Sequence, residues 1–508
     1  MNKQIWIDHL STWRQFLTER IRLSDDDGER IKNERQIRTI ERIRCGAVLN
    51  PALISEFISF SDYKKKEAAC DEFNFELNES QKQAVRYALG DAELTLIQGP
   101  PGTGKTQVIA EVCLQLLMRN PGIRILVCSE THVAVNNLLS RITNYKDRMR
   151  IVRIRDKEND DSVDEFSPEK IINSYLKWAE HSIQNKDARS IIDEELNEAL
   201  WGNPRKRNQI EKALALSSNI VGITCNRAAA YDFRDTTEMF DVAIIDEVCK
   251  ATLPEILSPL IISKKAILLG DPKQLPPVFC SAEQDVIRSI EHCNLNNFMY
   301  IDTLFADDKS VTVLDTQYRM SNQIGNMISD FFYHGSIKNG RNEDIEDSLS
   351  WITYKPSRKW PIRVEEESDK PKIYNEDECV IIVDLLEKLN ELDNFGGNIA
   401  VISPYRAQVS LLRQRCPKYT NVKIDTVDGF QGKESDIVIF SLTRTVGPYR
   451  FLTDVRRLNV ALSRAKDKIY IIGDTRYVEK SSFDSPILKN ILSRCKVVMY
   501  NTQKQLDN

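Results

Sequence analysis

Residues 94–106 read LTLIQGPPGTGKT, a short apolar run that leads directly into a glycine-rich loop. The loop satisfies the pattern G-x-x-x-x-G-K-[ST], with Gly99, Gly104, Lys105 and Thr106 at its fixed positions. The next residues, QVIAEVCLQLLMRN, have a helical pattern, so the loop joins an expected strand to an expected helix. In that setting, backbone N–H groups and the helix N-terminus face the negative oxygens of a triphosphate. The stretch predicts a nucleotide site on an α/β sheet.

The chemistry of this loop also predicts what it binds, a nucleoside triphosphate together with Mg²⁺. Lys105 is expected to reach the β and γ phosphates, and Thr106 is expected to place its hydroxyl on magnesium. The residues expected to bind the nucleotide here are Gly99, Pro100, Pro101, Gly102, Thr103, Gly104, Lys105 and Thr106.

A second motif, VAIIDEVCK at residues 242–250, supplies the carboxylates that such a site needs. Its apolar run delivers Asp246 and Glu247 to the carboxyl end of a strand, where α/β proteins bind ligands. We expect Asp246 to hold magnesium, directly or through water, and Glu247 to orient or deprotonate the attacking water. The alternative, a surface Asp-Glu pair in a turn, is disfavoured by the buried strand before it.

The composition describes a folded, water-soluble protein of more than one domain. The chain has 508 residues, 41% hydrophobic and 29% charged, and no apolar run long enough to span a membrane. Its eleven cysteines are scattered, which predicts reduced thiols and a cytoplasmic location, with no cysteine-based metal site. The net charge of −5 means that any binding of nucleic acid must use a local basic surface.

From about residue 77, short apolar runs alternate with helical patterns, as in parallel sheets covered by helices on both faces. The first group of runs is 94–98, 123–128, 220–224, 242–245 and 266–269. The second group is 311–314, 398–402, 422–426, 437–442 and 469–472. We therefore expect two α/β domains, at 77–305 and 306–508, after an N-terminal helical region at 1–76.

Three stretches do not show this alternation of short apolar runs and helical patterns. Residues 147–215 are highly charged and helical in pattern, which predicts a helical subdomain inserted in the first domain. Residues 338–375, rich in proline and acidic residues, predict a surface excursion. Within 1–76, an apolar stripe at Ile37, Ile40, Ile43 and Ala47 predicts a helix packed on the body, with direct contact to nucleic acid as the alternative.

Phosphoryl transfer also requires cations on the charge that develops at the γ-phosphate. Arg319 lies in LDTQYRM and Arg464 lies in RRLNVALSRAK. Either arginine alone would be interpreted as a surface residue, but the motifs around them favour a role in the site.

These motifs, taken together and in order, resemble those of superfamily 1 helicases, specifically the 5′-to-3′ branch that includes the nonsense-mediated decay helicase. The resemblance runs from about residue 77 to 474 and implies two RecA-like P-loop NTPase domains. The matching segments are LNESQKQAV, GPPGTGKT, SETHVAVNNL, VGITC, IIDEVCK, LLGDPKQLPPV, LDTQYRM, VISPYRAQ, TVDGFQGKESDIVIFSLTR and RRLNVALSRA.

The resemblance implies roles for residues around the nucleotide. Gln81 resembles the residue that reads the adenine edge, since its amide can both donate and accept. Tyr318 resembles the aromatic residue that stacks on adenine, and Arg319 resembles a γ-phosphate contact.

A second set of implied residues connects the nucleotide with the nucleic acid. Gln274 resembles the residue that links the γ-phosphate to the strand-binding surface, and Glu434 resembles its partner from the second domain. Arg464 matches the arginine finger, whose planar fork suits phosphate oxygens.

The partner implied by the resemblance is single-stranded DNA or RNA that crosses both domains. Backbone and hydroxyl groups are expected to hold its phosphates, including those of Thr131, Thr224 and Ser403. Closure of the domains on ATP and their release on hydrolysis would then produce a step along the strand.

The chain departs from the family pattern at two motifs and at its N-terminus. The family usually reads D-E-A-x-Q, whereas this chain has Val248 and Lys250 in place of alanine and glutamine. Ser129 and Glu130 stand where the family favours Ala-Pro, and an acidic residue beside a strand groove is unfavourable unless it is paired or turned away. The first 76 residues leave room for a helical stalk but little for the small β-barrel often found there.

Three functions fit these motifs to different degrees. An ATP-dependent helicase or translocase accounts for all of them. An ATP-gated clamp on nucleic acid or protein, with little unwinding, is favoured only by Lys250 and the slim N-terminal region. A metabolic kinase would explain the phosphate loop alone, and neither the second domain nor the arginine motifs.

Overall fold

The computed structural model divides into two compact units. The first comprises Met1–Gly99, Lys105–Pro272 and Pro276–Leu314, and the second comprises Pro100–Gly104, Lys273–Leu275 and Asp315–Asn508. The structure describes residues 3–58, 66–142, 149–155, 165–198, 204–230, 239–290, 300–306, 310–341, 343, 345–357, 362–365, 372–391, 397–416, 419–430, 432–447, 452, 454–480 and 486–501. Within these ranges, none of the helices is both long and apolar enough to cross a bilayer.

A seven-stranded sheet, parallel throughout, forms the centre of the first unit. Its order is β3 (Ile151–Arg153), β4 (Ile220–Thr224), β2 (Ile125–Ser129), β5 (Phe240–Ile245), β6 (Ser263–Gly270), β1 (Leu94–Gln98) and β7 (Val311–Val313). The strands are almost wholly buried, because helices cover both faces of a parallel sheet. This confirms the expected α/β architecture.

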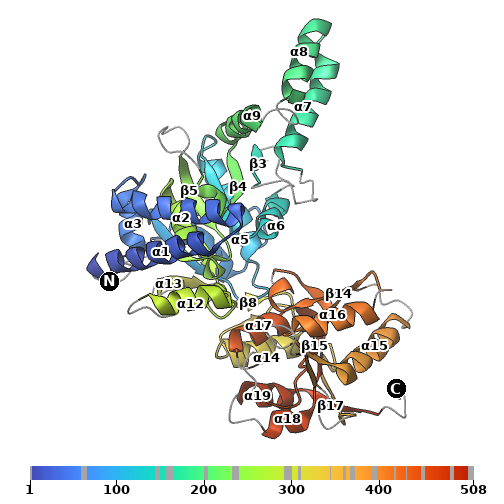
Figure 1. Cartoon of the computed structure of the whole chain (residues 1–508). Coiled ribbons are helices and arrows are strands. Elements are labelled where there is room, and N and C mark those ends of the chain that lie inside the picture. The colour runs from blue at the N-terminus through green and yellow to red at the C-terminus, as the bar shows by residue number, and fades with distance from the viewer. Residues whose placement is uncertain are drawn as a thin grey trace. The chain divides into compact units, whose positions relative to one another are not determined.

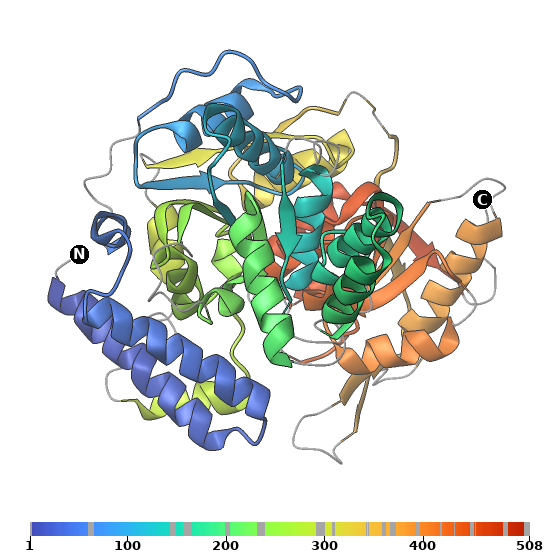
Figure 2. The same cartoon turned by 90° about the horizontal axis from the view of Figure 1, so that it is seen from above.

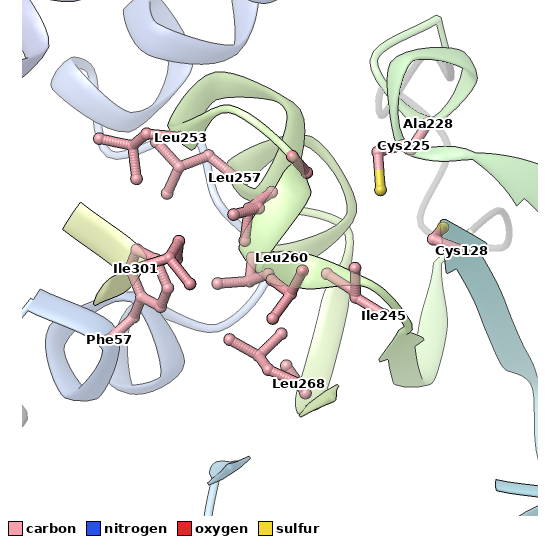
Figure 3. Packing of buried hydrophobic residues seen from close by; sticks show 14 of the residues in the cluster. Phe57, Cys128, Cys225, Ala228, Ile245, Leu253, Leu257, Leu260, Leu268 and Ile301 are labelled. Atoms are coloured by element: carbon pink, nitrogen blue, oxygen red, sulfur yellow. The ribbon is translucent and has the colours of Figure 1, made fainter. Parts of the chain in front are cut away.

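Alternate strand residues enter two separate apolar cores, as the two-residue period of a strand requires. Ile244 and Ile267 face the core that includes α4 (Glu79–Leu89), α5 (Lys105–Arg119) and α6 (His132–Ile142). Ile245 and Leu268 face the opposite core, where Figure 3 shows them beside Leu257 and Leu260. The second core is completed by α3 (Pro51–Ile58), α11 (Leu253–Leu260), α12 (Ser281–Ser289) and α13 (Tyr300–Phe305).

The expected N-terminal helices are present as α1 (Lys3–Leu23) and α2 (Asp27–Arg44), which lie side by side (Figure 2), followed by α3. Ile40 is fully buried and Ile37 and Ile43 pack against the same core, which confirms the predicted stripe. Ala47 was wrongly included. The helix ends at Arg44 because Gly46 takes a positive φ of 71°, a common helix-ending conformation, and Ala47 is exposed beyond it.

The segment predicted as an inserted helical subdomain is mostly helical. It contains α7 (Pro168–Ser182), α8 (Lys186–Asn197) and α9 (Pro204–Ser217), and Figure 1 shows α7 and α8 as a pair standing away from the sheet of the first unit. However, the segment starts with β3, which pairs with β4 at the edge of that sheet. A strand of three residues is too short to show a period in the sequence.

The second unit contains a six-stranded parallel sheet. Its order is β14 (Val422–Thr426), β13 (Ile399–Ser403), β15 (Ser435–Ser441), β16 (Ala465–Ile472), β10 (Leu349–Tyr354) and β17 (Lys496–Tyr500). The helices of this unit are α14 (Asn322–Phe332), α15 (Glu376–Glu391), α16 (Arg406–Arg415), α17 (Val455–Leu462), α18 (Thr475–Lys480) and α19 (Pro486–Arg494). The second expected α/β domain is therefore also confirmed as a fold.

Two strand assignments from the sequence are wrong. The run 311–314 was placed in the second domain, but β7 pairs with β1, and the first unit continues to Leu314, past the predicted boundary at 305. The stretch 338–375 is not merely a surface excursion, because β10 is buried between β16 and β17 and Trp351 Nε1 donates to the carbonyl oxygen of Gly473 at 2.8 Å. The same stretch also forms β9 (Lys338–Asn339), which pairs with β8 (Thr316–Gln317), and the hairpin β11 (Ile362–Glu365) and β12 (Lys372–Asn375).

Candidate functional site

The phosphate loop lies where the sequence placed it, between the end of β1 at Gln98 and the start of α5 at Lys105. Gly102 and Gly104 have φ of +73° and +80°, values at which any residue with a Cβ is strained. Thr103 is buried and its hydroxyl donates to the carbonyl oxygen of Pro100 at 2.8 Å. The glycines are therefore required by the backbone, and the loop is held by its own hydrogen bonds.

Lys105 and Thr106 are the first two residues of α5, so both stand at the positive end of that helix. The Lys105 ammonium donates to the carbonyl oxygen of Gly99 at 2.6 Å and lies 3.9 Å from Glu247 Oε1. The lysine therefore folds back along the loop, with its charge close to the carboxylates that follow β5.

Asp246 and Glu247 stand at the carboxyl end of β5, as expected. The N–H of Asp246 donates to the carbonyl oxygen of Cys128 at 2.9 Å, and the N–H of Glu247 donates to Asp246 Oδ1 at 2.9 Å. Burial raises the pKa of Asp246 to about 6, an effect that Glu247 increases and Lys105 opposes. Glu247 has a φ of 54°, an unusual backbone conformation of the kind that clusters at functional sites.

The residues proposed for magnesium fit that ion chemically. A threonine hydroxyl and a buried carboxylate are hard oxygen donors, and Mg²⁺ is commonly bound by one or two such groups together with substrate phosphates. In the described part of the chain, no three His, Cys, Asp or Glu side chains gather into a site of their own. The donor set therefore suits a cation that arrives with a nucleotide.

In the second unit, Arg319 is fixed by contacts from distant parts of the sequence. Its Nε donates to Glu434 Oε2 at 2.8 Å, and its Nη1 donates to the carbonyl oxygen of Ser463 at 3.1 Å. Lys466 lies 3.1 Å from the other oxygen of Glu434. Burial alone would raise the pKa of Glu434, but Arg319 and Lys466 outweigh burial and hold that pKa below its ordinary value. Glu434 is thus an anionic anchor for two cations.

Arg464 is almost fully buried and is also fixed by hydrogen bonds. Its Nη2 donates to Gln274 Oε1 at 3.1 Å, and its Nε donates to the carbonyl oxygen of Val460 at 2.9 Å. The structure therefore brings Gln274 to Arg464, and brings Glu434 to Arg319. The implied contact of Gln274 with Glu434 is not among these hydrogen bonds.

The two residues predicted to contact adenine have different surroundings. Tyr318 is 46% exposed, and a Cβ added to Gly340 would lie 2.4 Å from its ring, so the ring packs directly on that glycine. Gln81 is buried, and its side-chain oxygen accepts from the N–H of Asn78 at 3.0 Å in a capping box at the start of α4. The Gln81 amide is therefore already held at the start of α4 by one of the groups that a base contact could use.

The residues predicted to bind the nucleic-acid strand lie at, or shortly after, the carboxyl ends of their β-strands. Ser129 of β2 is in register with Thr224, the last residue of β4, so Thr224 and Thr131, which comes shortly after β2, lie at the same edge of the first sheet. Ser403 ends β13 in the second unit, but it is fully buried and its hydroxyl lies 3.1 Å from the hydroxyl of Thr443. All three contacts remain predictions.

One buried arginine that the sequence did not point to contacts α6, which directly follows the segment proposed to bind the nucleic-acid strand. Arg153 on β3 is fully buried, and its Nη2 lies 2.8 Å from Nδ1 of His132. Since a guanidinium only donates, Nδ1 of His132 must accept, which assigns the neutral Nε2–H tautomer to that ring. Asn136 also accepts from Arg153 Nε at 2.9 Å. The only sequence signal was an arginine directly after two apolar residues.

Two residues that differ from the family pattern, Glu130 and Lys250, contact each other. Lys250 Nζ lies 3.0 Å from Glu130 Oε2, and both side chains are partly exposed. The pairing oxygen of Glu130 is buried and accepts no hydrogen bond from the described residues, so the contact is an ion pair. The expectation that Glu130 must be paired or turned away is confirmed.

Comparison with known proteins identifies the family of the chain. Two family models described as AAA domain match the chain, one over residues 76–201 and 190–282 and the other over residues 296–476. The DNA polymerase alpha-associated DNA helicase A of Saccharomyces cerevisiae is 32% identical over 460 residues, which cover 80% of this chain and 66% of that protein. An uncharacterized ATP-dependent helicase of Methanocaldococcus jannaschii is 27% identical and covers 81% of this chain and 70% of its own length.

A third relative, the regulator of nonsense transcripts 1 homolog of Drosophila melanogaster, is 30% identical over 436 residues, which cover 81% of this chain. The chain belongs to the superfamily 1 helicases, in the group that includes the nonsense-mediated decay helicase. It spans 66% of the yeast relative and 36% of the Drosophila relative.

Proposed function

We propose that this chain is an ATP-dependent helicase or translocase that moves 5′-to-3′ along single-stranded DNA or RNA. The observation that carries the proposal is the meeting of the phosphate loop with the β5 carboxylates, where Lys105 lies 3.9 Å from Glu247. The relatives named as DNA helicase A and as an ATP-dependent helicase support the class of reaction, and polarity follows from the motif resemblance.

Within this proposal, the residues of the first unit bind ATP and prepare the attacking water. Lys105 binds the β and γ phosphates, and the loop N–H groups surround them. Thr106 and Asp246 would hold Mg²⁺, which neutralises charge on the phosphates and on the developing transition state. Glu247 accepts a hydrogen bond from the water and aims it at the γ-phosphorus.

The second unit supplies the cations. We propose that ATP is hydrolysed where residues of both units meet, with Arg319 and Arg464 on the γ-phosphate oxygens. Hydrogen bonds support this role, because they fix both guanidinium groups before the reaction. Arg319 is held by Glu434 and Ser463, and Arg464 is held by Gln274. Tyr318 would stack on adenine and Gln81 would contact its edge.

Nucleic acid is the proposed partner, and its phosphates are the proposed contact. Thr131, Thr224 and neighbouring backbone groups would bind the strand at the carboxyl edge of the first sheet, and the segment at Ser403 would bind it on the second unit. These contacts read no bases, so the proposal includes both DNA and RNA. A cytoplasmic location is part of the proposal and is supported only by cysteine usage, since no disulfide joins the described cysteines.

The direct test is ATP hydrolysis by the purified chain with and without single-stranded oligonucleotides, in DNA and RNA series. Strand-dependent stimulation supports a motor, and displacement of a duplex from a 5′-tailed substrate, with none from a 3′-tailed one, supports the polarity. A rate that is the same under all conditions contradicts the proposal.

An ATP-gated clamp is the second candidate, and Lys250 at the family's glutamine position is the observation that favours it. A clamp would bind strand tightly in the presence of a nonhydrolysable ATP analogue but would not displace a tailed duplex.

A further inference from the structure

Two segments with different expected tasks run side by side in the first unit. Segment 128–132 leads from β2 into α6 and contains the strand contact proposed at Thr131. Segment 246–250 leads from β5 through a short 3₁₀ turn and contains Glu247. The N–H of Asp246 donates to the carbonyl oxygen of Cys128 at 2.9 Å, which fixes the two segments to each other at one point.

The ion pair of Glu130 with Lys250 is a second connection between the same segments. Both side chains are partly exposed, but the pairing oxygen of Glu130 is buried. Glu130 also attracts Lys32 of α2 at longer range, while Lys32 itself pairs with Glu255 at 2.9 Å. Because Lys250 lies 3.0 Å away, the charge of Glu130 is largely offset beside the proposed strand surface.

Lys250 is also connected, through a tight turn of the backbone, to Glu247, the carboxylate proposed to orient the water. Its N–H donates to the carbonyl oxygen of Glu247 at 3.0 Å, and Glu247 holds the left-handed φ of 54°. The turn is closely packed, since a Cβ on Gly270 would lie 2.7 Å from Cys249 Sγ and 2.8 Å from Val248 Cγ1. Because the turn is closely packed, we expect a shift of the Lys250 backbone to move Glu247.

We infer that the Glu130–Lys250 ion pair is the contact through which strand bound at the 128–132 segment sets the position of Glu247, as a chain-specific substitute for the family's coupling glutamine. The inference rests on the proposed function. Lys250 and Glu130 are positioning residues here. They act by connecting Thr131, through one ion pair and one backbone hydrogen bond, to Glu247.

The test is the ratio of the ATPase rate at saturating single strand to the rate without strand, using oligo(dT) and oligo(U). Lys250→Met and Glu130→Gln each remove one charge with little change of side-chain length, and methionine also avoids restoring the family's glutamine at position 250. The double variant Glu130→Lys with Lys250→Glu exchanges the charges. Lys264→Gln is the matched control, because Lys264 forms a 2.8 Å ion pair with Asp241 at the opposite ends of the strands in the same unit.

The inference predicts that either single variant lowers the stimulation ratio by about 5-fold or more, the lower range of usual coupling strengths. The exchanged double variant restores the ratio to within about 2-fold of the unsubstituted chain, and the control leaves it unchanged. Because the rates are taken at saturating strand, weaker strand binding alone does not lower the ratio.

Two results would overturn the inference. Single variants that keep the full ratio exclude a coupling role, and so does a double variant that is as defective as the single variants, since the charge pair would then not be what matters. Either result leaves the proposed motor function standing, because single strand still stimulates ATP hydrolysis by the unsubstituted chain. An unsubstituted chain without stimulation overturns the motor and this inference together.

Discussion

The ammonium of Lys105 lies 3.9 Å from a carboxylate oxygen of Glu247, although α5 and β5 are separated by well over a hundred residues of sequence. The parallel sheet produces this relationship, since β1 and β5 end at the same edge on either side of β6. A nucleotide phosphate bound by Lys105 would therefore be close to the group proposed to orient the water.

Replacing Lys105 by alanine is expected to lower the strand-stimulated ATPase rate by about 100-fold or more, because a cation on the transferred phosphate is lost. Steady-state phosphate release measures the effect, and Lys264→Ala serves as the folded control with one surface lysine removed. A Lys105→Ala rate within about threefold of the unsubstituted chain would exclude this lysine from the chemistry.

Glu247→Gln preserves the shape of the side chain and removes its basicity. We expect the turnover rate to fall by about 100-fold, in the usual range for a general base, while the Kd for a fluorescent ATP analogue changes little. Stopped-flow binding and single-turnover hydrolysis separate the two effects. A variant that loses affinity and rate equally would show that Glu247 acts in binding instead.

Tyr318→Ala is expected to raise the KM for ATP by about 5-fold to 100-fold, the range given by stacking of one base on an aromatic ring. The ring is half exposed and its other face packs on Gly340, so Tyr318→Trp should retain most of the affinity. The control is hydrolysis of inorganic triphosphate, which has no base. If Tyr318→Ala slows that reaction as much as ATP hydrolysis, the stacking role is wrong.

The places of the phosphate loop and of the β5 carboxylates in the fold were predictable because their motifs are local. The phosphate loop is a continuous run whose glycines are required by φ values of its own backbone, and the carboxylates directly follow an apolar strand. A short window of sequence therefore contains all the constraints that shape each half of the site.

Pairings between distant segments were not predictable from local pattern. The contact of Arg319 with Glu434, 115 residues away, depends on how β15, α17 and β16 pack. Sheet membership is non-local in the same way, which is why β7 was assigned to the wrong domain. β10 was missed because serine and threonine interrupt its apolar residues, although the whole strand is buried.

Glu378 makes the stability of the second unit depend on pH. It is buried on α15 and accepts hydrogen bonds from Ser441, Thr443 and Tyr354, yet burial raises its pKa to about 7. The folded chain therefore binds this proton more tightly than the unfolded chain, whose glutamate titrates near 4.5. Its contribution is fully present below about 4.5 and is lost as pH rises through about 7.

The expected loss between pH 4.5 and pH 8 is about 3 kcal/mol of unfolding free energy, from the difference between the two pKa values. Urea unfolding midpoints measured across this range should fall with pH in the unsubstituted chain, and this component should be absent in Glu378→Gln. Parallel pH profiles for the two chains would show that Glu378 does not titrate in this window.

The central claim is that binding of a single strand and hydrolysis of ATP are one coupled process in this chain. The most direct measurement is the steady-state ATPase rate of the purified protein with Mg²⁺, titrated with single-stranded DNA and, separately, RNA. We predict a saturable rise in rate with at least one of the two, abolished in Lys105→Ala. A rate that is independent of either strand at all concentrations would contradict the claim.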